Sequence, residues 1–330
     1  MILMVGVGIV GIGSYVPPKI MTNEDWENLV DTSNKWIVEK TGIIERRISE
    51  PDVCTSDLAV FAAIKAMKMA KIKPEDIDMI ILATSSPDVP LSSTAGITQN
   101  KLGCINASAF DINAVCAGWI HALEIGTKFT ADNNYENILV IGAETYSRIV
   151  NWKDRSTCVL FGDGAGAAVL QKVEEGKGML GTWIKSDGSG ANVIEIPAGG
   201  VRKSLSSDSF VEGEQYFQMN GRAVWDFAID AMPEAVINVL KRVNRDLSEV
   251  DMIIPHQANL NIIKEGMKKL NLPMEKTFIN LQKYGNTAGA SVPIALSEAV
   301  SEGKIKSGDL VVTVAFGGGL AWGANAMIWQ

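Results

Sequence analysis

The chain contains an internal repeat, and this repeat restricts the possible fold more than any other feature. Residues 77–81 read IDMII, and 173 positions later residues 250–254 read VDMII. Each segment follows a helical pattern, at 62–70 and 235–243, and each runs into a polar turn. Two further apolar strands, 137–141 and 309–313, lie 172 positions apart. Agreement of several elements in order and spacing indicates a duplicated half.

Each half is predicted to run strand, helix, strand, helix, strand. Short apolar strands that alternate with helices favour largely parallel sheets covered by helices. Two such halves stacked through their central helices would form an α/β fold, a thiolase-like five-layer α/β/α/β/α sandwich. We assign residues 1–170 to the first half, 171–220 to connecting hairpins and loops, and 221–330 to the second half. The repeat also predicts that Cys116 and residues 286–290 are pseudo-symmetric and lie close together.

Composition excludes several classes of protein. The 330 residues are 47% hydrophobic, enough for a large core, and the net charge of −8 argues against general nucleic-acid binding. Four cysteines without a C-x-x-C pair argue against a zinc knuckle or redox motif and fit a reducing cytoplasm. The uncharged segment 1–18 contains four glycines and ends in two prolines. We therefore interpret it as a buried strand and turn, and expect neither a signal peptide nor a membrane helix.

Two glycine-rich segments resemble phosphate-binding loops but lack the required context. Residues 6–11 match G-x-G-x-x-G, yet the chain continues into β-branched residues and Pro17-Pro18, which do not open a helix. Residues 162–166 read GDGAG and continue into a strand-like segment without a Lys-Ser/Thr pair. We interpret both as places where the backbone turns or packs closely.

The residues suited to catalysis are a cysteine, a histidine and an asparagine. Cys116 follows a predicted strand at 107–112 and precedes a predicted helix at 117–127, a position where the helix N-terminus is expected to lower the thiol pKa. His256 follows an apolar strand. Asn286 lies in a Gly-Asn turn, where its amide could donate to a carbonyl. Residues 316–319, FGGG, offer backbone N–H groups suited to an oxyanion hole.

The other cysteines and the second histidine are expected to be structural. Cys54, Cys104 and Cys158 have no catalytic context and are interpreted as buried structural residues. His121 lies within the predicted helix after Cys116 and is interpreted as a helix residue.

At these residues the chain resembles the β-ketoacyl-ACP synthase III family, the initiating condensing enzymes of bacterial fatty-acid synthesis. The similarity extends over essentially the whole chain. It includes residues 11–17 and 36–43, and FDINAVCAG at 110–118. It also includes PHQAN at 255–259, GNT at 285–287, AFGGG at 315–319 and Trp322-Gly323.

The resemblance implies a catalytic set of Cys116, His256 and Asn286. It implies that Cys116 is acylated by an acyl-CoA, most often acetyl-CoA, with the N–H groups of Cys116 and Gly318 holding the oxyanion. His256 and Asn286 would then stabilise the enolate formed when malonyl-ACP loses CO₂. Cys–His–Asn differs from the Cys–His–His of elongating synthases, and thiolases use a second cysteine near the C-terminus. The implied partners are acyl-CoA, malonyl-ACP and a second subunit of a homodimer, with no cofactor or metal.

The resemblance also implies substrate contacts. Trp36 and Arg155 match residues that flank the CoA adenine, and Thr41 and Asn259 match residues along the CoA tunnel. Lys40 and Asn261 stand where arginine is common, and the two residue types are not equivalent towards phosphate. Trp225 stands where phenylalanine is usual near the tunnel. Its larger ring either alters access to the tunnel or the size of the starter, or is a packing residue of an amphipathic helix. Lys264 and Lys268, with Asn261, either form an ACP-docking face or belong to a solvated helix surface.

Two rival functions follow from the same residues. One is another Cys-dependent enzyme of this fold, with a different starter or in specialised metabolism, because starter choice depends on tunnel walls. Hydroxymethylglutaryl-CoA synthase shares the fold with an added catalytic Glu, which the turn at 84–88 does not offer. The other rival is an inactive scaffold, which the intact Cys–His–Asn set argues against.

Overall fold

The structure, a computed structural model, describes residues 6–330 and contains two mixed sheets. The first has five strands in the order β1-β7-β6-β4-β5, and the second has four in the order β11-β12-β13-β8. The strands of the first sheet are β1 (Gly6–Tyr15), β4 (Met79–Ala83), β5 (Ser108–Ile112), β6 (Ile138–Thr145) and β7 (Asp163–Val173). Those of the second are β8 (Gly178–Ser186), β11 (Met252–Pro255), β12 (Leu310–Gly317) and β13 (Ala321–Ile328).

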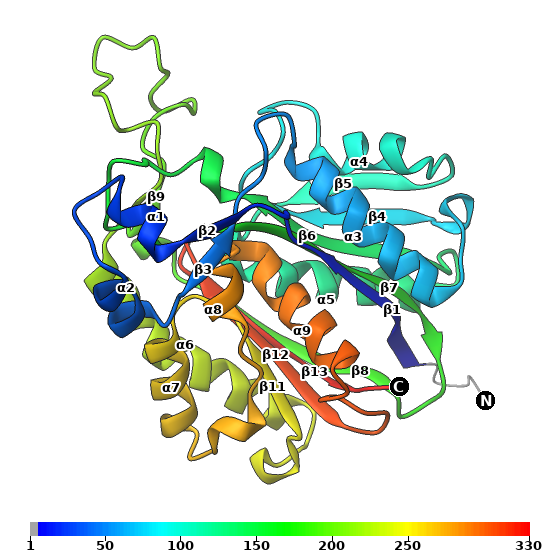
Figure 1. Cartoon of the computed structure of the whole chain (residues 1–330). Helices are drawn as coiled ribbons and strands as arrows, with labels where there is room; N and C mark the ends of the chain where they lie inside the picture. The colour runs from blue at the N-terminus through cyan, green and yellow to red at the C-terminus, as the bar shows by residue number, and fades with distance from the viewer. Residues whose placement is uncertain (1–5) are drawn as a thin grey trace.

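Helices cover both sheets and fill the space between them (Figure 1). Helix α3 (Thr55–Ala70) lies on the outer face of the first sheet, beside α4 (Thr94–Leu102). Helix α6 (Gly221–Arg242) lies on the outer face of the second, beside α7 (Leu260–Lys269). The central helices α5 (Gly118–Ala131) and α9 (Ser291–Ser301) contact strands of both sheets. The predicted five-layer sandwich is therefore confirmed.

Smaller elements complete the part of the chain that the structure describes. Strands β2 (Ile20–Thr22) and β3 (Glu45–Arg47) pair with each other, as do β9 (Ile194–Glu195) and β10 (Gln218–Met219). The remaining helices are α1 (Asn23–Glu27), α2 (Asn34–Thr41) and α8 (Leu281–Tyr284). The segment between β9 and β10, yellow-green in Figure 1, projects from the body of the molecule.

Four strands of the first sheet have the same order as the four strands of the second once the repeat is applied, and β5 has no counterpart. β4 begins 173 positions before β11, and the helices α5 and α9 also begin 173 positions apart. Strand β4 pairs in parallel with β6, as β11 does with β12, while β6–β7 and β12–β13 are antiparallel. Two residues with positive φ, Lys71 (58°) and Asn244 (53°), end α3 and α6 at equivalent positions. The duplication inferred from sequence thus extends to backbone conformation.

One prediction about the sheets is wrong. We expected largely parallel sheets, but β7 and β13 are antiparallel to both of their neighbours. The cause is that β13 follows β12 through a short turn and β7 follows β6 without an intervening α-helix, so neither connection is the helical crossover that a parallel pair requires. Strand β8 lies within the 171–220 stretch that we assigned to a connection, and it forms an edge of the second sheet.

The glycine-rich segments adopt the extended or closely packed backbone that we expected. Strand β1 runs through residues 6–15 without opening a helix, and Met1 to Val5 of the expected first strand lie outside the described residues. At Gly166 an added Cβ would lie 2.5 Å from the Cβ of Pro293 on α9. Gly162 similarly faces the carbonyl of Tyr284 at 2.3 Å. These glycines let the first sheet approach the segment that carries Asn286.

Candidate active site

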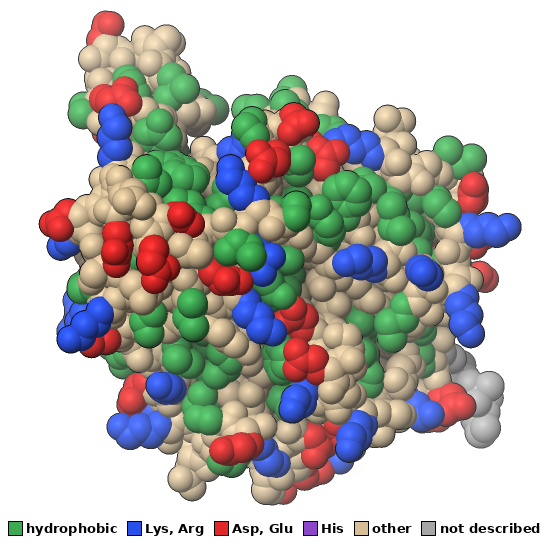
Figure 2. Space-filling model, in the orientation of Figure 1, with side chains coloured by type: hydrophobic (Ala, Val, Ile, Leu, Met, Phe, Trp, Pro, Cys, Tyr) green, Lys and Arg blue, Asp and Glu red, His purple; other side chains and the backbone are tan. Residues whose placement is uncertain are grey.

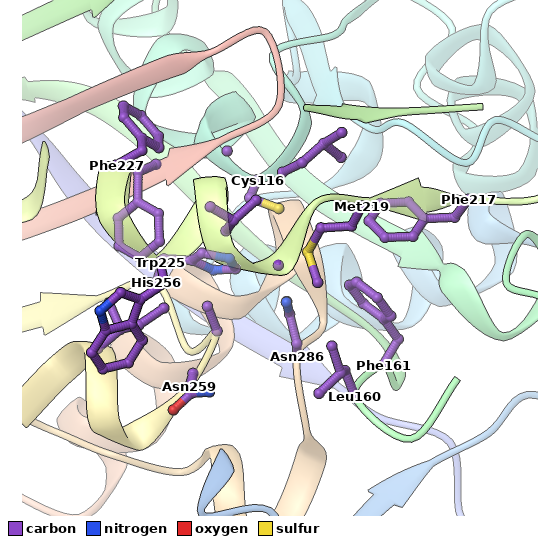
Figure 3. Close-up of a pocket in the computed structure, with 17 residues that line it drawn as sticks. Cys116, Leu160, Phe161, Phe217, Met219, Trp225, Phe227, His256, Asn259 and Asn286 are labelled. Atoms are coloured by element: carbon purple, nitrogen blue, oxygen red, sulfur yellow. The ribbon is translucent and has the colours of Figure 1, made fainter. Parts of the chain in front are cut away.

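A single cavity of about 180 Å³ is lined by Cys116, His256 and Asn286 (Figure 3). The three residues come from different places in the fold: Cys116 from η2 (Val115–Ala117), His256 from the end of β11, and Asn286 from the turn after α8. All three are buried, and Cys116 is 7% exposed. Much of the remaining wall is apolar and includes Phe161, Ile194, Phe217, Met219, Trp225, Phe227 and Phe316.

The turn that carries Cys116 is held in a strained conformation. The side-chain oxygen of Asn113 accepts the N–H of Val115 at 3.0 Å, and Val115 has a φ of 47°. Positive φ is costly for a β-branched residue and is found mainly where the surrounding structure imposes it. On the other side, an added Cβ at Gly317 would lie 2.9 Å from the Cβ of Cys116. Only glycine at 317 leaves room for the nucleophile there.

The turn that carries Asn286 repeats the turn before Cys116. The Asn286 Oδ1 atom accepts the N–H of Ala288 at 2.8 Å, and Ala288 has a φ of 44°. Asn113 and Asn286 are 173 positions apart, as are Val115 and Ala288. Because the Asn286 oxygen is occupied, its NH₂ group is the part available to the cavity. The two turns also touch, since an added Cβ at Gly289 would lie 3.2 Å from the carbonyl of Val115.

Burial keeps His256 neutral. The imidazole lines the cavity, packs edge-on against Phe316, and has Nδ1 2.6 Å from the Ser291 hydroxyl. Removing a charged ring from water is costly, so burial lowers the pKa of His256 to about 3. A neutral imidazole that cannot be charged near pH 7 is suited to donate one hydrogen bond and not to act as a cation.

The expected lowering of the Cys116 pKa is wrong for the free protein. Cys116 does precede α5, as predicted, but burial raises the pKa of its thiol well above the ordinary value. The negative charge of Glu144 raises this pKa further, and the Cys116 backbone N–H lowers it. Sequence showed the helix start but could not show how completely the sulfur is removed from water.

Glu144 is a residue near the site that we did not predict from sequence. It ends β6 inside the protein and accepts hydrogen bonds from Thr84, Ser85 and Ser86. Burial raises the pKa of Glu144 to about 7, although these hydrogen bonds lower it. The available signal was a single acidic residue in an otherwise apolar strand, at 138–145, which is unusual for a buried segment.

Some predicted substrate residues gather near the cavity and others lie outside it. Trp225 and Asn259 line the cavity. The Asn259 amide donates to the carbonyl of Lys40, and the Asn261 amide donates to the same oxygen, so α7 is tied to α2. Gly318 packs against Ile194 and Val115 beside the cavity.

Trp36, Arg155 and Thr41 are not among the cavity residues. The Arg155 guanidinium lies over the Trp36 ring, 5.6 Å from its centroid, and forms an ion pair with Asp31. Thr41 is buried; its hydroxyl donates to the carbonyl of Ile37 and accepts the N–H of Ile43.

The remaining cysteines and His121 are not among the residues that line the cavity. Cys104 and Cys158 are buried, as expected, but Cys54 is exposed because it precedes the first residue of α3 at the surface. All four cysteines are free. His121 places Nδ1 3.0 Å from the carbonyl of Ala117 within α5, which fits the structural role we predicted.

The surface shows no dominant positive region on the face in Figure 2, where basic and acidic side chains are interspersed. Within residues 6–330, no helix combines the length and apolar character needed to cross a membrane.

Known proteins match this chain over nearly all of its length. Family models described as 3-oxoacyl-[acyl-carrier-protein] synthase III and its C-terminal part match residues 110–188 and 240–329. The β-ketoacyl-[acyl-carrier-protein] synthase III of Caldanaerobacter subterraneus subsp. tengcongensis is 51% identical, over 99% of this chain and 98% of that protein.

Solved structures give the same result. The 3-oxoacyl-[acyl-carrier-protein] synthase III of Aquifex aeolicus is 43% identical with a TM-score of 0.91, covering 98% of this chain and all of that one. The Thermus thermophilus β-ketoacyl-[acyl-carrier-protein] synthase III is 40% identical with a TM-score of 0.92, covering 98% and 99% of the two chains.

We predict that Glu144→Gln increases the reactivity of Cys116 at pH 8 and leaves it nearly unchanged at pH 6. Above its pKa of about 7 the Glu144 carboxylate is charged and raises the thiol pKa; below it, the carboxyl is neutral. Removing this charge should raise the labelling rate roughly three- to tenfold at pH 8. Iodoacetamide labelling of Cys116, followed by intact-protein mass spectrometry, measures this rate. The exposed Glu249→Gln is the control, and an equal change at both pH values would contradict the prediction.

Proposed function

The chain belongs to the β-ketoacyl-[acyl-carrier-protein] synthase III family, and from that premise we propose how its own residues carry out the reaction. It is an acyltransferase that condenses an acyl-CoA with malonyl-ACP and so initiates fatty-acid synthesis. The observation that supports the residue roles is the cavity that Cys116, His256 and Asn286 share. Each of these residues is contributed by a turn that the two halves hold in place.

In the first half-reaction, Cys116 accepts the acyl group. Its sulfur attacks the thioester carbonyl of the acyl-CoA, and the backbone N–H groups of Cys116 and Gly318 hold the oxyanion. The C–S bond to CoA breaks and the acyl-Cys116 thioester remains. The Cys116 proton leaves with CoA as its free thiol. Burial raises the pKa of the Cys116 thiol, so we propose that proton loss accompanies the attack.

In the second half-reaction, His256 and Asn286 stabilise an enolate. The malonyl-ACP thioester oxygen receives hydrogen bonds from the neutral imidazole and from the Asn286 NH₂ group, and negative charge grows on that oxygen as CO₂ leaves. The resulting carbanion attacks the acyl-Cys116 carbonyl. Cys116 is released and 3-oxoacyl-ACP is formed. Loss of CO₂ drives the condensation, so the reaction needs no metal or cofactor besides its substrates.

We predict that the two half-reactions respond differently to substitution. Cys116→Ala should form no acetyl adduct with acetyl-CoA. Asn286→Ala should still acylate Cys116, but its malonyl-ACP decarboxylation should fall about 10²–10³-fold because one oxyanion donor is lost. Intact-protein mass spectrometry measures the adduct, and CO₂ release measures the second step. His121→Gln is the control and should retain both. Full decarboxylation by Asn286→Ala would refute the role of the amide.

We propose acetyl-CoA as the starter because one end of the cavity is closed by aromatic rings. Phe161 and Phe217 are buried, line the cavity and contact each other edge-on with centroids 4.9 Å apart. Tyr146 packs behind both rings. At the other end Trp225 and Asn259 are only half-buried, so substrate enters there. This arrangement leaves little room beyond Cys116 for a long acyl chain.

Shortening the aromatic wall should therefore change the starter. We predict that Phe217→Ala raises kcat/KM for butyryl-CoA relative to acetyl-CoA by about tenfold or more, since each methylene fitted in an apolar pocket contributes roughly 10- to 200-fold. Competition assays with paired acyl-CoAs measure the ratio. Phe129→Leu is the control, because Phe129 lies on α5, packs against Tyr135 and does not line the cavity. An unchanged ratio in Phe217→Ala would exclude this wall as the determinant.

We propose that α7 contributes to ACP docking. Lys264 and Lys268 are exposed on this helix, which begins beside Asn259 at the open end of the cavity, and ACP is acidic. The opposing consideration is that Lys268 pairs with Glu265 and Lys269 with Asp230, as on an ordinary helix surface. Asn261 contributes through its bonds to α2 and not through charge.

Charge reversal distinguishes these alternatives. The double variant Lys264→Glu/Lys268→Glu should raise KM for malonyl-ACP several-fold while leaving acetyl-CoA-dependent acylation of Cys116 unchanged, since charge complementarity acts mainly on encounter with the acidic partner. The control is Lys304→Glu, an exposed lysine after α9. Equal KM values for malonyl-ACP in the variant and control would show that α7 is only a solvated surface.

The CoA contacts of Trp36, Lys40, Thr41 and Arg155 are also part of this proposal. The Trp36–Arg155 stack and the α2–α7 contact lie on the side of Asn259, where CoA would leave the cavity. For the chain we further propose a homodimer in the cytoplasm. Val89 and Leu91 are exposed in one loop, and a second subunit would cover this apolar surface; four free thiols fit a reducing compartment. Light scattering that gives one chain's mass would refute the dimer.

A further inference from the structure

The imidazole of His256 contacts the hydroxyl of Ser291, a residue that has no role in either half-reaction. Its Nδ1 lies 2.6 Å from the Ser291 Oγ atom, and both residues are buried. The same Oγ accepts the backbone N–H of Gln257 at 3.3 Å. Among the described residues these are the two partners of the hydroxyl.

The hydrogen-bond inventory decides which nitrogen of His256 carries the proton. An N–H group only donates, so the Gln257 contact makes Ser291 Oγ an acceptor and leaves its own proton to be placed. The remaining acceptor is His256 Nδ1. If Nδ1 carried the proton instead, the Ser291 hydroxyl proton would be buried without an acceptor, which is strongly disfavoured. The neutral ring therefore carries its proton on Nε2.

We propose that Ser291 is a positioning residue that fixes His256 as the Nε2–H tautomer, so that the imidazole can donate to the malonyl thioester oxygen. The inference rests on the proposed roles of His256 and Asn286. In this tautomer His256 offers the cavity a donor and no acceptor, so it cannot serve as the base for Cys116. Ser291 should consequently matter for decarboxylation and not for acylation.

The segment 286–291 thus orients both enolate-stabilising donors. The N–H of Ala288 fixes the amide of Asn286, and the Ser291 hydroxyl fixes the imidazole. The first half repeats the Asn turn, in which Asn113 binds the N–H of Val115, but it lacks the histidine and the hydroxyl. At the positions equivalent to His256 and Ser291, 173 residues earlier, stand Ala83 and Gly118, and an added Cβ at Gly118 would lie 3.0 Å from the Cβ of Ala83. In this chain the second half therefore has both the histidine and its hydroxyl, and the first half has neither.

The tautomer can be measured directly because the chain has only two histidines. In ¹⁵N-histidine-labelled protein at pH 8, nitrogen chemical shifts distinguish the two neutral forms. His121 has Nδ1 3.0 Å from a carbonyl, which only accepts, so it should be the Nδ1–H form and serve as an internal reference. His121→Gln assigns the signals. His256 should show the opposite, Nε2–H pattern. An Nδ1–H pattern for His256 in the wild-type protein overturns the proposal, whatever the activity data show.

Substitution separates positioning from simple packing. Ser291→Ala should lower malonyl-ACP decarboxylation about 10- to 100-fold and shift the His256 signals towards a tautomer mixture, while acetyl-adduct formation on Cys116 changes less than twofold. Ser291→Thr, which keeps the hydroxyl, should recover most of the rate and the Nε2–H pattern. Equal losses in acylation and decarboxylation, or an unchanged tautomer with unchanged decarboxylation, would overturn the proposal. If either variant fails to fold, the wild-type spectrum still decides.

Discussion

The contact between the two turns that precede the central helices is the constraint on which the site depends. Helices α5 and α9 can lie between the sheets only if their N-terminal turns meet, and there the carbonyl of Val115 comes so close to Gly289 that a side chain would intrude. Both turns use an Asn side chain to bind the N–H two residues later and both place a non-glycine residue at positive φ. Such backbone strain persists only where packing on all sides enforces it. The nucleophile and the amide donor are thereby fixed on rigid elements.

Burial is the largest influence on the pKa values of four titratable groups near the cavity. It raises the pKa values of Cys116, Glu144 and Tyr146 and lowers that of His256, so the neutral form of each is favoured. A dry site that holds a neutral thiol and a neutral imidazole has few charges of its own. Hydrogen-bond donors in such a site act strongly on negative charge that develops on substrate oxygens, because little water competes for them. The helix N-terminus at Cys116 stabilises negative charge on the sulfur only once the attack on the substrate has begun and the thiol proton is leaving.

The sequence predicted the architecture well because a duplication is supported by many residues together and does not depend on any single one. The IDMII and VDMII segments, and the strands 172 positions apart, located equivalent elements of both halves, and the elements agree with the structure. The repeat could not show that β7 and β13 are antiparallel to their neighbours, because the apolar pattern of a strand is the same for parallel and antiparallel pairing. The pKa of Cys116 was predicted in the wrong direction because local sequence shows a helix start but not the depth of burial. Glu144 and Ser291 were missed because each acts through contacts with residues distant in the sequence.

The two halves have diverged into different roles around one pseudo-symmetric centre. Where the first half has Cys116, the second has Gly289, and where the second has His256 and Ser291, the first has Ala83 and Gly118. Gly317, which lies beside Cys116, corresponds to Glu144, which lies beside Gly289. A second cysteine at 289 would face a carboxylate, and a charged group at that distance would oppose its ionisation. Retaining one nucleophile in one half and the donors in the other avoids this conflict, because each half can then supply an environment suited to a single task.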